Sequence, residues 1–167
     1  MNTNLVPDNI EKVKRSQFVT FLDTTPSSQT PTWALLGIGI TDYGIAYNPQ
    51  IEQEKWIIED NARNIHESNQ KQSTVSQSIY KNDPCFEFAY AGLDQLNYKT
   101  HILDIDRYNG TGSSFPAKMS DGILAITNYM GENATIEYDL YYDGDSVEGT
   151  VSFDSSGVPT FTPNTSL

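Results

Sequence analysis

Short runs in which apolar and polar residues alternate recur along this chain, and their period of two predicts β-strands rather than helices. Residues with strong turn preference separate the runs, as is typical of an antiparallel β-sandwich or barrel. The dipeptide Asp143-Gly144 predicts the clearest hairpin, because tight turns need residues that tolerate a positive φ. The predicted strands cover residues 18–22, 36–40, 43–47, 55–59, 75–80, 101–106, 136–142 and 147–153.

One segment departs from this pattern and predicts a short α-helix over 84–97 that flanks the sheet. Asp83 can cap a helix, and the following proline suits the first helical position. The apolar residues after it recur at spacings of three and four, which places them on one stripe of about three turns. The residues expected to define this flanking helix are Pro84, Phe86, Tyr90 and Leu93.

The segment 60–73 is polar almost throughout and shows no period, which predicts a long loop between strands. A loop of this length inside a compact domain is typically functional or disordered. We expect one domain over 1–167, with its core at about 14–153 and extended arms at 1–13 and 154–167.

The charge balance argues against one class of function. The 167 residues include 22 acidic and 10 basic side chains, a formal net charge of −12. A protein that binds nucleic acid neutralises phosphates with lysine and arginine, so the acidic excess argues against simple nucleic-acid binding but not against a place near DNA. The lone Cys85 predicts no internal disulfide, and no signal peptide or membrane-length apolar run is expected. We therefore expect folding in a reducing cytoplasm.

The residues that carry catalysis or bind metals form no recognisable motif. His66, His101 and Cys85 lack the spacing of zinc ligands, and no serine lies in a nucleophile-elbow pattern. Asp104 and Asp106 share a strand face and can form a carboxylate pair, but an exposed or lumen-facing acidic strand explains them equally well. We predict no catalytic, cofactor-binding or metal-binding residues, and no cofactor.

Five motifs follow one another in an order that carries a resemblance. They are the Trp-led apolar run 33–41, the Tyr-Asn-Pro turn 47–49, the Trp-Ile-Ile-Glu run 56–59, Asp83-Pro84 at the helix start, and the Gly-Thr-Val strand 149–151. In this order the chain resembles the major tail protein, or tail tube protein, of long-tailed bacteriophages that infect Gram-positive hosts. The resemblance covers about residues 14–153.

This resemblance implies a structural protein and no enzyme. Subunits of that family form hexameric rings that stack into a tube, and genomic DNA passes down the lumen. The helix is implied to brace the outside of the ring, and the long loop to join successive rings. The residues assigned to this inter-ring loop are Asp60, Arg63, Asn64, Ile65, His66, Glu67, Asn69 and Lys71. The acids expected to face either the lumen or solvent are Glu52, Glu54, Glu59, Glu137 and Asp139.

The resemblance also implies partners and a location. The chain is expected to bind copies of itself, a tape-measure protein, and tail-terminator or baseplate proteins, which share this fold in related families. DNA is met only in transit, no membrane is bound, and the protein reaches the virion after synthesis in the host bacterial cytoplasm. The alternative is a carbohydrate- or receptor-binding β-sandwich of a phage tail or bacterial surface, in which Trp33 or Trp56 stacks on sugars.

Overall fold

The computed structural model describes residues 10–165 and confirms the predicted fold class, because the protein is mainly β, with antiparallel strands and a short α-helix. The helix α1 spans Pro84–Ala91, and single 3₁₀ turns span Arg15–Gln17 and Arg107–Asn109. Within residues 10–165 no helix is long and apolar enough to cross a membrane. The strands are β1 (Phe18–Asp23), β2 (Trp33–Leu36), β3 (Pro49–Glu54), β4 (Arg63–Asn69), β5 (Gln72–Ser78), β6 (Tyr98–Asp106), β7 (Phe115–Gly131), β8 (Thr135–Phe153) and β9 (Pro159–Pro163).

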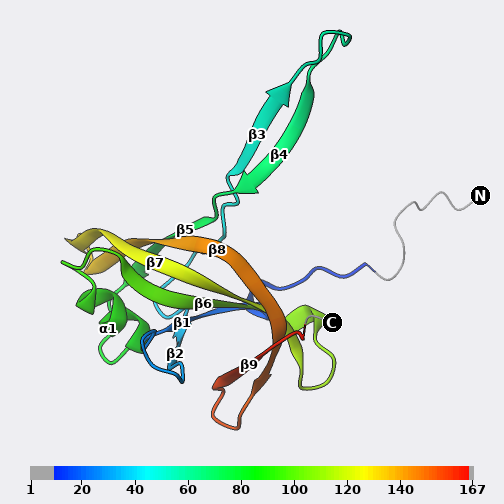
Figure 1. Ribbon diagram of the computed structural model, residues 1–167. Helices are drawn as coiled ribbons and strands as arrows, with labels where there is room; N and C mark the ends of the chain where they lie inside the picture. Colours follow the sequence, from blue (N-terminus) through cyan, green and yellow to red (C-terminus); the bar gives the residue numbers. More distant parts are fainter. Residues whose placement is uncertain (1–9, 166–167) are drawn as a thin grey trace, which may run out of the picture.

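The main sheet curls until its two edges almost meet. Its strand order is β2-β1-β6-β7-β8-β5, and β9 pairs with the C-terminal part of β8. The chain after β2 joins the edges, because the Ser78 N–H donates to the Gly39 carbonyl at 2.9 Å and Ala46 bridges to Gln72. In Figure 1 the long strands cross the body side by side, with α1 at one side of them. Near-closure covers backbone groups that an open sheet edge would leave free.

Apolar side chains fill both faces of the central strands. One buried cluster lies between the sheet and α1 and includes Leu22, Ile102 and Tyr138. A second cluster, on the opposite face, includes Phe21 and Leu103. Neighbouring residues of β1 and of β6 therefore enter different cores. Strict alternation of buried and exposed residues survives in β5, which carries a core on one face only.

The start of the helix was predicted correctly, but its end was not. The Asp83 side chain accepts a hydrogen bond from the Cys85 N–H at 3.1 Å, and proline holds the first helical position, as expected. The helix stops at Ala91, with Gly92 as its C-cap, whereas 84–97 was predicted. Leu93 and Leu96 thus lie beyond the helix. The buried face consists of Cys85, Phe88 and Ala89, so the predicted stripe through Phe86 and Tyr90 is displaced by about one residue.

A buried polar network ties α1 to the sheet. The Gln77 side-chain amide donates to the Asp83 carboxylate at 2.6 Å and to the Ile38 carbonyl at 3.0 Å. The Tyr138 hydroxyl in turn donates to the Gln77 carbonyl oxygen at 3.0 Å. Burial raises the pKa of the neighbouring Cys85 thiol to about 12, so this thiol is inert at neutral pH.

Three of the predicted strands do not form as expected. The run 36–40 belongs to a strand only at its first residue, because β2 ends at Leu36 and residues 37–39 form a turn with Gly39 at φ 73°. Within 43–47 only Ala46 forms a β-bridge. The run 55–59 is the exposed tip of a hairpin, which is described below.

The Asp143-Gly144 dipeptide forms no hairpin turn. It lies inside β8, where Met119 faces Val147 and the next pair is Asp121 with Asp143, so residues 144–146 bulge out opposite a single residue of β7. Gly144 has a positive φ of 75°, as the dipeptide predicted. The turn between β7 and β8 lies instead at residues 132–134. The prediction identified the backbone conformation and mistook a bulge for a turn.

The predicted arms also need correction. Residues 159–163 form β9, which pairs with residues 149–153 of β8, so the C-terminal segment is part of the sheet through Pro163. Of the predicted N-terminal arm, residues 1–9 lie outside the described chain, and residues 10–13 have no regular secondary structure. The folded core therefore extends beyond the predicted boundary at 153.

Candidate assembly surface

A two-stranded hairpin projects from the body and accounts for most of the predicted inter-ring residues. Strands β3 and β4 pair only with each other, and every residue of both is exposed. Figure 1 shows this hairpin extending well away from the main sheet. The loop predicted over 60–73 is thus wrong as a secondary structure. Arg63, Asn64, Ile65, His66, Glu67 and Asn69 lie on β4, Asp60 lies at the tip, and Lys71 lies at the base.

The shaft of the hairpin is held by its backbone ladder and a few polar contacts. Glu52 faces Ile65 and Glu54 faces Arg63 across the ladder, with a register shift at residues 50–51. The Gln53 side-chain amide donates to the Asn64 side-chain oxygen at 3.2 Å. An isolated two-stranded hairpin is marginally stable in water. The shape of the arm thus depends on its ladder and on these few side-chain contacts.

The hairpin tip presents apolar side chains to solvent. Ile57 and Ile58 are 101% and 84% exposed, and Trp56 is about half exposed. The tip is nevertheless ordered by polar neighbours, because the Arg63 guanidinium lies 4.1 Å from the Trp56 ring centroid and pairs with Glu59. The Trp56 indole N–H donates to a Glu54 carboxylate oxygen at 3.0 Å. These contacts hold the tryptophan against the shaft, whereas the two isoleucines remain exposed to solvent.

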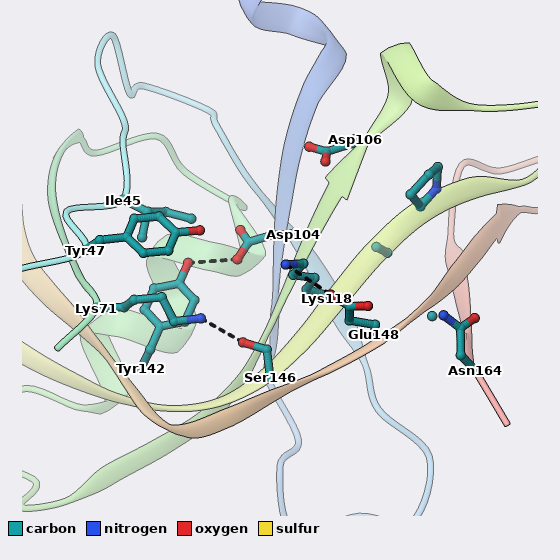
Figure 2. A pocket seen from close by; sticks show the side chains of 13 residues that line it. Ile45, Tyr47, Lys71, Asp104, Asp106, Lys118, Tyr142, Ser146, Glu148 and Asn164 are labelled. Atoms are coloured by element: carbon teal, nitrogen blue, oxygen red, sulfur yellow. Dashed lines mark hydrogen bonds and ion pairs between the residues drawn. The ribbon is translucent and has the colours of Figure 1, made fainter. Parts of the chain in front are cut away.

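A lysine at the base of the hairpin contacts the body. Figure 2 shows Lys71 between Tyr47 and Tyr142. Its ammonium donates to the Ser146 hydroxyl at 2.8 Å and lies 5.0 Å from the Tyr142 ring centroid and 5.8 Å from that of Tyr47. The Ser146 hydroxyl also lies 2.7 Å from the Ser120 hydroxyl, within the bulge between β7 and β8. The bulge residues and the lysine together set where the arm leaves the sheet.

Lys71, Tyr47, Tyr142 and Ser146 line a pocket with a volume of about 330 Å³. Asp104 lies in the wall of this pocket. Its carboxylate accepts hydrogen bonds from the Thr20 hydroxyl at 2.7 Å and the Tyr142 hydroxyl at 2.9 Å. Burial raises the pKa of the Asp104 carboxyl, although these bonds and the charge of Lys71 act in the opposite direction. Asp106 lines this pocket too, but the bonds of Asp104 are to Thr20 and Tyr142 rather than to a second carboxylate.

The raised pKa predicts a pH effect for the Asp104→Asn variant. A carboxyl whose pKa is higher in the folded than in the unfolded chain stabilises the fold fully below the unfolded pKa of about 3.9, and that stabilisation is lost as pH rises through the folded pKa. Asparagine lacks this loss, so the free energy of unfolding of the variant should rise relative to wild type between pH 4 and pH 7. Urea melts at both pH values measure the difference. A difference that falls with pH would contradict the assignment.

The five acids predicted to face a lumen or solvent occupy two separate places. Glu52, Glu54 and Glu59 lie on the projecting hairpin, away from the main sheet. Glu137 and Asp139 lie on β8 and alternate with the buried residues of the helix-covered core, so they point to the other face. There the Thr74 hydroxyl donates to Asp139 at 2.8 Å and the Ser76 hydroxyl donates to Glu137 at 3.4 Å. Of the five acids, only Glu137 and Asp139 therefore lie on the main sheet.

Both histidines of the described chain contact polar side chains. His101 Nδ1 lies 2.8 Å from a buried Asp23 carboxylate oxygen, and its Nε2 lies 3.5 Å from Asp121. His66 bonds to Asn69 on the hairpin at 2.8 Å. Residues 10–165 hold no group of three or more histidine, cysteine, aspartate or glutamate side chains arranged for a metal ion.

Sequence reasoning missed the residues at the hairpin base, namely Tyr47, Tyr142, Ser146 and Ser120, because they meet only through tertiary contacts. The Tyr-Asn-Pro turn was the available signal, since Asn48 has a φ of 44° immediately before β3. The two tryptophans are also far apart, with Trp33 on β2 and Trp56 at the hairpin tip (Figure 1). A sugar would therefore meet only one of them.

Comparison of the sequence with models of known families and with curated proteins gave no match.

Proposed function

We propose that this protein is a structural, non-enzymatic subunit of a bacteriophage tail tube that assembles with copies of itself. The projecting hairpin with two exposed isoleucines at its tip carries this proposal. An arm whose residues are all exposed adds nothing to the core of its own subunit and places apolar surface in water. Such a surface is typical of a protein–protein contact.

The arrangement of the arm also favours an assembly that repeats. The hairpin tip and the body are different surfaces, so a contact between one subunit's tip and another's body is heterologous. Heterologous contacts generate closed rings or open filaments. Rings stacked through such arms form a tube, which is the architecture that the resemblance in the sequence implies. The nearly closed sheet and the flanking helix agree with the same family pattern.

The charge of the chain suits a conduit for DNA. A net charge of −12 per subunit repels phosphate, so a polyanion can pass without being held. Screening over about 8 Å at physiological salt confines this effect to the wall. Of the five acids named from the sequence, Glu137 and Asp139 lie on the main sheet and are the candidates for this wall. The location is then the virion, with tape-measure, terminator and baseplate proteins as partners.

Electron microscopy of the purified, concentrated full-length protein tests the proposal. We expect rings or hollow tubes, with a sedimentation coefficient that rises with protein concentration. Lowering the salt concentration should weaken assembly, because acidic subunits then repel each other over a longer distance. A chain that stays monomeric at every protein and salt concentration would contradict the proposal.

A further inference from the structure

An apolar groove lies at the end of the molecule opposite the hairpin. It has a volume of about 680 Å³ and runs between the loop before β2 and strand β9, which Figure 1 shows at the far end from the β3–β4 tip. We call it the β2–β9 groove. Its apolar lining includes Trp33, Met119, Val147, Val158 and Phe161. Val147 and Val158 are 45% and 47% exposed, so a single subunit leaves them in contact with water.

Contacts within a single subunit hold both walls of this groove in place. Phe161 faces Val151 in the β8–β9 ladder, and Gly149 permits the close approach of β9, because a Cβ there would meet the Phe161 ring. On the other wall, Asp23 accepts hydrogen bonds from the Thr25 and Thr32 N–H groups at 2.9 and 3.0 Å and so holds the loop before β2. A preformed apolar groove favours binding, since little ordering is needed.

We propose that the β2–β9 groove receives the hairpin tip of a second copy of this chain. The hairpin and the groove lie at opposite ends of the subunit, so a tip cannot reach the groove of its own chain (Figure 1). The match is chemical as well as geometric, because Ile57 and Ile58 are the most exposed apolar pair of the tip and the groove is lined by apolar side chains. This inference rests on the proposed self-assembly and identifies the surface that accepts the arm.

One pair of charges beside the two surfaces is complementary, although Glu54, Glu59 and Asp60 also flank the tip. Lys55 is the first residue of the tip and forms no ion pair within residues 10–165. Asp121, whose side chain is 74% exposed, stands beside His101 on the groove lining and directly opposite Asp143 in the ladder. Like charges facing each other across a ladder are unfavourable, so a lysine from a second copy relieves this pair. The contact repeats head to tail along an axis, because each copy offers both surfaces.

Single and mixed variants test the pairing. Ile57→Asp places a charge on the apolar tip, and Val158→Asp places one in the apolar groove. Each variant alone should raise the protein concentration needed for tubes by at least tenfold. Mixing the two variants restores one intact contact, so particles of two layers should form and lengthen no further. Ile51→Asp on the exposed shaft of β3 is the matched control and should assemble normally. Because all three positions are exposed, thermal melts should match wild type.

A disulfide trap separates failure of the groove from failure of the proposed function. A chain carrying Ile57→Cys and Val158→Cys should form a ladder of oxidised oligomers, whereas either single variant should not; the native Cys85 is buried. If wild type forms tubes but the double variant does not cross-link and Val158→Asp assembles normally, the groove proposal is wrong and the tube function stands. If wild type never assembles, both are wrong.

Discussion

Excision of residues 49–69 is expected to abolish tube formation and to leave the subunit folded. The two ends of the excised segment already touch, because the Gln70 N–H donates to the Asn48 carbonyl at 3.3 Å and the Asn48 side-chain amide donates to the Gln70 carbonyl at 3.1 Å. A two-residue glycine linker can therefore close the gap. Among the described residues, β3 and β4 contribute nothing to either buried cluster. The free energy of unfolding should stay within about 1 kcal/mol of wild type.

Electron microscopy and urea melts of the same preparation measure the two halves of this prediction. A deletion of 61–72, within the polar segment, would instead remove β4, Lys71 and Gln72 and would leave β3 unpaired and the base unanchored. The matched control is Ile51→Asp, which changes the shaft and keeps the tip. Tubes formed by the excised chain would show that the hairpin has no part in assembly.

The features that the sequence predicted well are those decided by local chemistry. β6 follows its alternating residues, and so does β8 on either side of its bulge, although two strands were predicted there. α1 starts at Asp83 and Pro84, because capping and the fixed proline φ act within a few residues. The helix end was missed because the apolar spacing continues through Leu93 and Leu96, whereas the helix ends at Ala91. Leu96 is 93% exposed, so its apolar character had no bearing on a helical stripe.

The features that were missed depend on where a strand lies in space. Both faces of β3 and β4 meet water, so no alternation marks them and β4 was predicted as a loop. The apolar run 56–58 imitated a buried strand while forming an exposed tip. The contact of Lys71 with Ser146 joins residues 75 positions apart in the chain, and no local pattern encodes it. An exposed apolar run next to a patternless polar segment is thus a usable signal for a projecting arm.

Asp23→Ala is expected to destabilise the fold by about 3 kcal/mol, because a buried carboxylate with several donors is removed. Asp23 is fully buried, and it accepts hydrogen bonds from the Thr25 and Thr32 N–H groups in addition to its 2.8 Å contact with His101. Alanine leaves those donors without a partner in the fold. Thermal melts should show a decrease in Tm of about 6 to 12 °C for a chain of this size.

Two further variants separate the charge of Asp23 from its hydrogen-bonding geometry. Asn at position 23 keeps one acceptor oxygen for the loop N–H groups, so Asp23→Asn should lose about half as much stability as alanine. Asp121→Asn changes the exposed acid beside the same histidine and should shift unfolding by no more than about 0.5 kcal/mol. Because the loop that Asp23 holds forms one wall of the β2–β9 groove, Asp23→Asn should also weaken tube formation at temperatures where the subunit remains folded. Equal stability of the alanine variant and wild type would show that this buried carboxylate does not hold the loop.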